Sequence, residues 1–144
     1  MIVSSNPAPV TRSTRGRLLT DRPTRVLVAE DDSDFRRLVA CVLERDGHEV
    51  TAVADGRSLR QEIDVDGHCP WDAVVTDVCM PGATGLDVLW SLRDEDKAPP
   101  IILMSAFADD SVHLQARRWG AFAVFEKPFD IDDLRTAVLA ALDE

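Results

Sequence analysis

The sequence predicts an α/β protein with a doubly wound, five-stranded parallel sheet in the strand order 2-1-3-4-5. Two observations predict this fold. From residue 25 onward, short apolar runs alternate with segments of helical periodicity, and four of the five runs are continuously apolar. Continuous apolar runs are typical of parallel strands that helices cover on both faces. The five expected strands are residues 26–29, 48–53, 73–76, 101–104 and 122–125.

The second run and the segments between the runs complete the pattern. Residues 48–53 (HEVTAV) alternate more than the other runs, which favours an edge strand. The first helical segment, 33–46, has Ser33 as its expected N-cap and Gly47 as its stop. Its predicted core-facing stripe consists of Phe35, Leu38, Val39, Val42 and Leu43. The other expected helices are residues 56–65, 84–93, 110–119 and 131–142, the last with Asp130 as N-cap and Asp133 in an approximate capping box.

The composition indicates one soluble globular domain. Of the 144 residues, 45% are hydrophobic and 29% are charged, and no stretch approaches the ~18 consecutive apolar residues of a membrane span. The first residues lack a secretory signal, so we expect a cytoplasmic protein that does not bind membranes. The three cysteines suggest no disulfide, and Cys41 is expected to be a buried small hydrophobe. His68, Cys69 and Cys79 match no zinc-binding spacing.

Residues 1–24 differ from the rest of the chain. Their prolines, serines, threonines and scattered arginines show no apolar period, which predicts a disordered leader before one domain at residues 25–144. Residues 1–25 carry five arginines and one aspartate, a net charge of +4, whereas the remainder carries −14. So acidic a domain repels nucleic acid, and we expect no direct nucleic-acid binding. The basic leader suits an acidic partner, although a solvated segment is the simpler interpretation.

Polar residues interrupt the apolar pattern at one kind of place, the carboxyl ends of the expected strands. Glu30 and Asp31 follow the first strand, Asp77 ends the third, Ser105 ends the fourth and Lys127 follows the fifth. In open α/β sheets, ligands bind at the carboxyl ends of the strands where the strand order reverses, here between the first and third strands. Each residue alone fits an ordinary helix cap or surface position, but together the five predict one site.

The charge of this site predicts a bound cation. Three neighbouring carboxylates repel one another unless a cation lies between them. Hard oxygen ligands suit Mg²⁺, which would cancel the charge that repels an incoming phosphoryl group. Lys127 would then contact a phosphate oxygen, Ser105 would donate its hydroxyl, and one carboxylate would be the nucleophile. Calcium fits less well, because D-D-S-D-F-R lacks the glycine of an EF-hand loop.

These motifs resemble the receiver domain of bacterial two-component response regulators. The resemblance rests on VLVAEDD (26–32), VVTDVCMPGATG (74–85), IILMSA (101–106) and FEKPF (125–129), within residues 25–142. The D-x-x-M-P-x-x-x-G spacing followed by a later K-P is highly specific. The resemblance implies a flavodoxin-like (βα)5 sandwich that accepts a phosphoryl group from a histidine kinase or a histidine phosphotransfer protein. It therefore implies a signalling phosphoacceptor in a phosphorelay, which catalyses only its own phosphorylation and dephosphorylation and is not otherwise an enzyme.

The family implies a role for each matching residue. Asp77 is the expected phosphoacceptor. Asp31 and Asp77 are expected to bind Mg²⁺ directly, with the backbone carbonyl of Cys79 as a further ligand and Glu30 acting through water.

The remaining matches complete the expected site. Ser105 stands at the position of the family's switch serine or threonine, and Lys127 at that of its lysine. A cis peptide bond before Pro128 is implied by resemblance alone. Gly82 and Gly85 fit the tight loop after the nucleophile, where positive φ or close packing is needed.

One position departs from the family pattern. The family usually has an aromatic residue three positions before the lysine, as a rotating reporter of phosphorylation, and this chain has Val124. Trp119 and Phe122 are expected on or beside the face made by the fourth helix, fifth strand and fifth helix (α4-β5-α5), which receivers use for homodimers and other protein partners. The alternative is that these two rings fill the space of the missing aromatic side chain.

Other classes fit the residues less well. A haloacid-dehalogenase-like phosphatase also uses an aspartate nucleophile, but its D-x-D motif after the first strand is absent. A flavin-binding protein of the same strand order needs a phosphate-cradling first loop, whereas the carboxylates of residues 30–32 repel a phosphate. A binding-only receiver would lack one of the five site residues. Nothing after the receiver motifs predicts a helix-turn-helix, so we expect a stand-alone receiver without an output domain.

Overall fold

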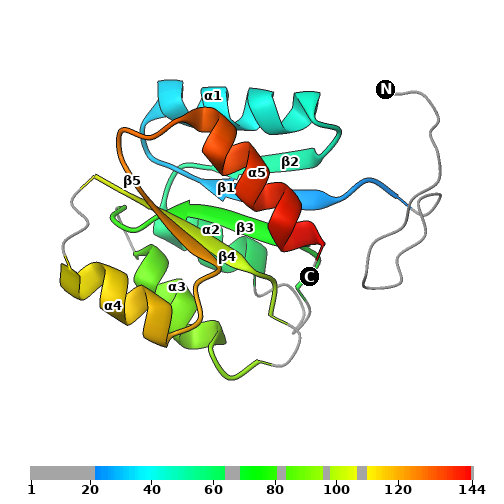
Figure 1. The fold of residues 1–144 in the computed structure, drawn as a ribbon. Coiled ribbons are helices and arrows are strands. Elements are labelled where there is room, and N and C mark those ends of the chain that lie inside the picture. The colour runs from blue at the N-terminus through cyan, green and yellow to red at the C-terminus, as the bar shows by residue number, and fades with distance from the viewer. Residues whose placement is uncertain (1–21, 64–68, 81–83, 96–97, 107–109, 144) are drawn as a thin grey trace.

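A computed structural model describes residues 22–63, 69–80, 84–95, 98–106 and 110–143, in which five strands alternate with five helices (Figure 1). The strands are β1 (Arg25–Ala29), β2 (Glu49–Val53), β3 (Ala73–Asp77), β4 (Ile101–Ser105) and β5 (Ala123–Glu126). The helices are α1 (Ser33–Arg45), α2 (Gly56–Ile63), α3 (Gly85–Leu92), α4 (Asp110–Arg118) and α5 (Ile131–Leu142). None of these helices is long and apolar enough to cross a membrane.

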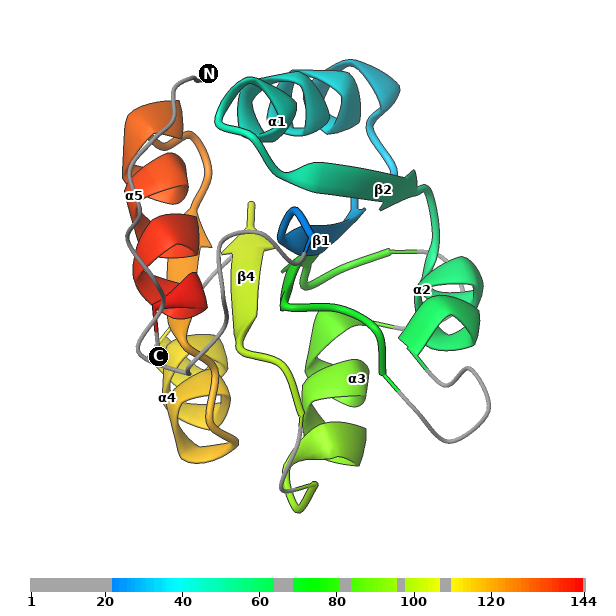
Figure 2. The same ribbon diagram turned by 90° about the vertical axis from the view of Figure 1, so that its right-hand side faces the viewer.

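The sheet has the predicted topology. All four strand pairs are parallel, and the order is β2-β1-β3-β4-β5. Helices α1 and α5 cover one face, and α2, α3 and α4 cover the other (Figure 2). Strands β3 and β4 are buried along their whole length, whereas β2 and β5 are partly exposed at the two edges. The edge strand that the alternating pattern of residues 48–53 predicted is therefore confirmed as β2.

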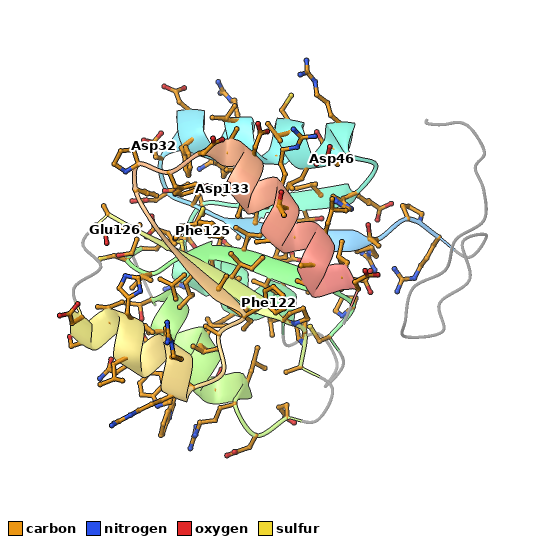
Figure 3. All side chains as sticks on the ribbon, in the orientation of Figure 1. Asp32, Asp46, Phe122, Phe125, Glu126 and Asp133 are labelled. Atoms are coloured by element: carbon orange, nitrogen blue, oxygen red, sulfur yellow. The ribbon has the colours of Figure 1, made fainter. Side chains whose placement is uncertain are left out.

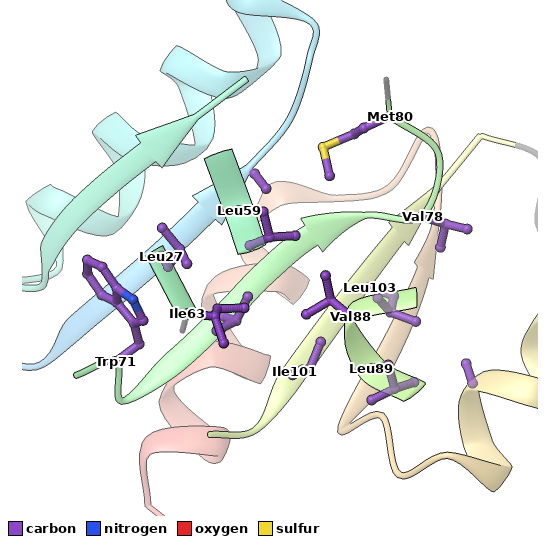
Figure 4. Close-up of a cluster of buried hydrophobic side chains, with 13 residues drawn as sticks. Leu27, Leu59, Ile63, Trp71, Val78, Met80, Val88, Leu89, Ile101 and Leu103 are labelled. Carbon is purple, nitrogen blue, oxygen red and sulfur yellow. The ribbon is translucent and has the colours of Figure 1, made fainter. Parts of the chain in front are cut away.

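Two apolar clusters hold the helices to the sheet, one on each face, because successive side chains of a strand point to opposite faces. The α2–α4 cluster includes Leu27, Leu59, Trp71, Val88 and Leu103 (Figure 4). The α1–α5 cluster includes Val28, Val39, Leu43, Leu134 and Val138. Burial of both strand faces fixes the sheet, so the carboxyl ends of β1 and β3 are held side by side.

Helix α1 differs from the prediction in three details. Its N-cap is Asp32 rather than Ser33, because the Asp32 carboxylate accepts hydrogen bonds from the first-turn backbone N–H groups. Leu38 is 47% exposed and Cys41 is exposed, so neither belongs to the core. The buried line runs through Val39, and each residue turns ~100° about the helix axis, which rotates Leu38 out toward solvent.

The other helix ends agree with the prediction within one or two residues where they are described. Asp130 caps α5 as expected, by accepting from the backbone N–H of Asp132, while Asp133 donates its backbone N–H to the carbonyl of Asp130 at 3.0 Å. Gly47 and Gly120 follow α1 and α4 with φ of +98° and +88°, the left-handed conformation of a helix stop. The predicted end of α2 beyond Ile63 lies outside the described residues.

Candidate functional site

Three carboxylates converge at the carboxyl edge of the sheet. Glu30 and Asp31 directly follow β1, and Asp77 is the last residue of the neighbouring strand β3. One carboxylate oxygen from each lies within 4.8 Å of the other two. Glu30 and Asp77 are buried, whereas Asp31 is exposed. This donor set consists of hard oxygens with one side open to solvent, so these residues fit a hydrated Mg²⁺ ion.

Lys127 closes the buried side of the carboxylate group. Its Nζ donates to Oε1 of Glu30 at 2.6 Å and to Oδ2 of Asp77 at 2.8 Å. Burial alone would lower the pKa of Lys127, but its hydrogen bonds to Asp77 and Glu30 outweigh burial, and the pKa is raised. For Glu30, burial has the larger effect and raises the pKa of the carboxyl group, although the hydrogen bond from Lys127 lowers it. Lys127 is therefore a firmly charged cation that offsets part of the negative charge of the site.

The loop after β3 fixes the side chain of Asp77. Its Oδ1 accepts a hydrogen bond from the backbone N–H of Cys79 at 3.0 Å, and its Oδ2 accepts the hydrogen bond from Lys127. Gly85 packs on the same loop: its N–H donates to the carbonyl of Val78 at 2.9 Å, and a Cβ at this position would lie 2.6 Å from the backbone oxygen of Asp77. Close packing, not positive φ, is thus the reason for glycine here. Gly82 lies outside the described residues, and the Cys79 carbonyl stays a predicted ligand.

The loop after β1 is held by a residue that the sequence reasoning missed. Nη1 of Arg36, in the first turns of α1, donates to the backbone carbonyl of Glu30 at 2.9 Å. The backbone N–H of Glu30 donates to the carbonyl of Val53, and its Oε2 accepts the N–H of Asp32 at 3.1 Å. A side-chain contact to a backbone carbonyl leaves no motif, and only the nearness of Arg36 to the acidic pair could have indicated it.

Ser105 and Lys127 lie at the ends of neighbouring strands. The backbone N–H of Lys127 donates to the carbonyl of Ser105 at 2.7 Å, and the side chain of Ser105 is buried. The peptide bond between Lys127 and Pro128 is cis, as the resemblance implied. The ring of Phe35 lies 4.9 Å from Nζ of Lys127 and packs edge-on against Phe129. The five predicted site residues therefore all lie at the carboxyl edge of the sheet.

The two aromatic residues expected near the α4-β5-α5 face pack in different places. Trp119 packs against the α2–α4 cluster, as does Val124, and its ring lies 4.7 Å from that of Trp90. Phe122 packs against the α1–α5 cluster, beside the end of β5 that lies far from the site (Figure 3). Because Trp119 shares its cluster with Val124, its packing supports the interpretation that it fills space near the missing ring. Phe122 does not share that cluster.

The fold and the site define a phosphoacceptor domain of the kind found in signal transduction. Residues 26–139 match the response regulator receiver domain family. The chain is 35% identical over 124 residues to the C4-dicarboxylate transport transcriptional regulatory protein DctD of Pseudomonas aeruginosa, covering 85% of this chain and 26% of DctD. It is 29% identical to sporulation initiation phosphotransferase F of Bacillus subtilis, covering 79% of this chain and 90% of that protein.

A solved structure of the same class gives a similar result. The response regulator protein TrrA of Thermotoga maritima, in complex with Mg²⁺ and BeF, superimposes with a TM-score of 0.70 at 29% identity, covering 82% of this chain and 98% of TrrA. The chain belongs to the response regulator receiver domain family. The chain spans about a quarter of the length of DctD, so the similarity concerns the receiver domain and not the rest of that regulator.

Proposed function

We propose that Asp77 is the residue that accepts the phosphoryl group, in a reaction that requires Mg²⁺. The observation that carries this proposal is the setting of its carboxylate, which accepts the Cys79 N–H and Lys127 Nζ and lies within 4.8 Å of the oxygens of Glu30 and Asp31. Membership of the receiver family makes the domain a phosphoacceptor. Asp77 is the buried aspartate at the end of a central strand, where the backbone holds the nucleophile in place.

The phosphoryl donor in this proposal is a phosphohistidine of a histidine kinase or a histidine phosphotransfer protein. A carboxylate oxygen of Asp77 bonds to phosphorus, the bond from phosphorus to the histidine nitrogen breaks, and that nitrogen keeps the electron pair. Mg²⁺, when bound, offsets the charge of the phosphoryl oxygens. Asp31 and Asp77 would hold it directly with the Cys79 carbonyl, and Glu30 through water. The ammonium group of Lys127 would exchange its contact with the Asp77 carboxylate for one with a phosphoryl oxygen. The hydroxyl of Ser105 would donate a hydrogen bond to a second phosphoryl oxygen.

Signal output in this proposal passes to a protein partner through the α4-β5-α5 face. Strand β5 is an edge strand, and the helices on its two sides carry exposed leucines, Leu114 at 52% and Leu139 at 55%. Exposed apolar side chains beside an unpaired strand edge are suited to protein docking. The domain would act in the cytoplasm without direct nucleic-acid binding, and it would catalyse only its own phosphorylation and dephosphorylation.

The test uses acetyl phosphate as the donor and intact-mass spectrometry as the readout. Wild-type protein with Mg²⁺ should gain one phosphoryl group, and a chelator should prevent the gain. Asp77→Asn should gain none, while Asp130→Asn, whose amide oxygen can still cap α5, should behave as wild type. Persistent phosphorylation of Asp77→Asn would place the acceptor elsewhere.

Metal binding is measured separately, by isothermal titration calorimetry with Mg²⁺. Asp31→Asn should weaken binding strongly, because a small hard cation takes few protein ligands here. Glu30→Gln should weaken it less, because its contact passes through water. Equal affinity of Asp31→Asn and wild type would contradict the metal assignment.

A further inference from the structure

The ends of α3 and α4 form an exposed aromatic surface at the amino edge of the sheet, opposite the edge that holds Asp77. Trp90 lies in the last turn of α3, and Trp119 directly follows α4. Their ring centroids are 4.7 Å apart with an interplanar angle of 59°. Trp90 is nevertheless 45% exposed, and the Arg93 guanidinium carbon lies 3.2 Å from its ring centroid. A half-exposed tryptophan stacked with arginine is typical of a binding surface.

A groove adjoins this tryptophan surface. It encloses about 190 Å³ between the end of α3, the start of β4 and the end of α4. Its apolar walls include Leu92, Pro99, Pro100 and Trp119, and Arg93 and Glu95 are its charged residues. The groove and the exposed ring of Trp90 therefore offer an apolar centre with a charged border, the usual arrangement of a protein–protein contact.

Charges of opposite sign lie on the two sides of the tryptophan pair. On one side, Arg117 and Arg118 are exposed in the last turn of α4. On the other, Asp94 is 88% exposed and Glu95 is exposed just after α3. The arginines suit the negative end of the α4 dipole, whereas the two carboxylates lie at a helix end that disfavours them. The ion pair between Arg93 and Asp94 is long, at 3.8 Å, so it is a weak competitor for another cation at Asp94.

We propose that a second copy of this chain docks on the tryptophan surface about a twofold axis. A twofold axis places the same patch on both copies, so the patch must be complementary to itself. Here Trp90 of each copy lies near the axis, and Arg117 and Arg118 of one copy face Asp94 and Glu95 of the other. The mixed charges also suit contact between two molecules that each carry −10. This dimer forms without phosphorylation, and it leaves Leu139 and the α5 side of the α4-β5-α5 face to the output partner.

The first test is sedimentation equilibrium of the full chain at low and high salt. Wild-type protein should form a dimer that weakens as salt rises, because charged pairs border the contact. Trp90→Ser should raise the dissociation constant at least about tenfold, as expected for a central tryptophan. Leu139→Ser on α5, which removes a similarly exposed apolar side chain, should leave it unchanged. Thermal melts confirm that both variants fold.

A charge-swap experiment tests the twofold geometry. An all-acidic variant (Arg117→Glu with Arg118→Glu) and an all-basic variant (Asp94→Arg with Glu95→Arg) should each be monomeric alone. An equimolar mixture should form a heterodimer, because each contact is again between opposite charges. A monomeric wild type, undiminished dimerisation of Trp90→Ser, loss of the dimer in Leu139→Ser, or variants that stay monomeric when mixed would each overturn the proposal.

Discussion

Lys127 is the residue on which the charge balance of the site depends. Its ammonium group contacts Glu30 and Asp77 at 2.6 and 2.8 Å, and it comes from the opposite end of the sequence. One cation cannot offset the three neighbouring carboxylates, which is the physical reason for expecting a metal ion as well. The carboxylate Asp31, being exposed, is the one that a hydrated ion meets first. The charge of Lys127 and the exposure of Asp31 therefore distinguish the roles of these two residues, which the sequence analysis only placed in the same site.

Gly85 provides a test of how tightly the phosphoacceptor loop must pack. Gly85→Ala would place a Cβ 2.6 Å from the backbone oxygen of Asp77 and 3.0 Å from Cγ2 of Thr76. Relief of this clash should cost about 1–3 kcal/mol of unfolding free energy, measured by urea denaturation. It should also slow phosphorylation by acetyl phosphate, because Asp77 must shift.

A second glycine provides the matched control for Gly85. Gly47 has φ of +98°, a Cβ added to it would meet no atom within 4 Å, and it lies far from the phosphoacceptor. Gly47→Ala should cost about 1 kcal/mol through backbone strain and leave the phosphorylation rate unchanged. Equal phosphorylation rates in the two variants would show that Gly85 has no influence on the site.

His48 makes stability depend on pH. Burial lowers the pKa of its imidazole, against the charge of Asp46. Nδ1 is hydrogen-bonded to the Thr24 hydroxyl, and Nε2 is buried with no hydrogen-bond partner among the described residues. The folded protein therefore binds a proton at His48 less readily than the unfolded chain does. Above pH ~6.5 the imidazole is neutral in both states and the protein has its full stability. As the pH falls through that value toward the folded pKa, the unfolded chain takes up a proton first and the stability of the folded protein decreases.

The pH effect can be isolated by substitution. His48→Asn keeps an acceptor for Thr24 and removes the titrating ring. From about pH 8 to 5.5, the free energy of unfolding of wild-type protein should therefore fall relative to that of His48→Asn. Urea denaturation at several pH values measures the difference. A difference that stays constant with pH would contradict a buried neutral histidine.

Helix α1 shows where sequence periodicity reaches its limit at the scale of an element. Five apolar residues fit the predicted stripe, but a helix packed on a sheet buries a narrower line, and Leu38 is left outside. The cap moved from Ser33 to Asp32 because both are good N-caps, and no local rule distinguishes neighbouring candidates. The Trp90–Trp119 contact joins helices far apart in sequence, so no local pattern predicts it.

Helix α4 offers a readout of phosphorylation at the same scale. It follows β4, which ends at Ser105, and Trp119 directly follows its last residue. Binding of a phosphoryl oxygen by Ser105 should shift α4, and the tryptophan emission should change because the rings of Trp119 and Trp90 are in contact. Beryllofluoride with Mg²⁺ should produce this change in wild type and in Trp71→Phe, but not in Trp119→Phe. A change that survives Trp119→Phe would assign the signal to another region.

At the scale of the whole molecule, the order of the strands and the edge that holds the site were predictable, because buried parallel strands have a distinct apolar pattern. The close packing of Gly85 beside Asp77 was also predictable, because this glycine is part of the motif that follows the phosphoacceptor. The role of Arg36 was less accessible, because it acts through a hydrogen bond to the backbone carbonyl of Glu30. That contact depends on how the first turns of α1 approach the end of β1, which the fold determines and no motif records.

The boundary between leader and domain gives the last prediction. Arg22 and Thr24, which the sequence pattern grouped with the leader, contact the domain: Arg22 Nη1 donates to Oδ2 of Asp72 at 3.1 Å, and the Thr24 carbonyl accepts the N–H of Glu49 at 2.8 Å. A chain that begins at Arg22 should therefore melt within about 2 °C of the full chain, because residues 1–21 have little apolar surface to bury.

A chain that begins at Arg25 provides the contrast. It lacks the Thr24 bonds to Glu49 and His48, so about 1–2 kcal/mol of stability should be lost. For a domain of this size, the loss corresponds to a melting temperature roughly 3–8 °C lower, measurable by calorimetry. A large drop already in the chain that begins at Arg22 would mean that the leader itself docks on the domain. Equal melting of all three chains would instead mean that the Arg22 and Thr24 contacts contribute nothing to stability, since pairing with β1 and packing against α1 would then be enough to hold β2.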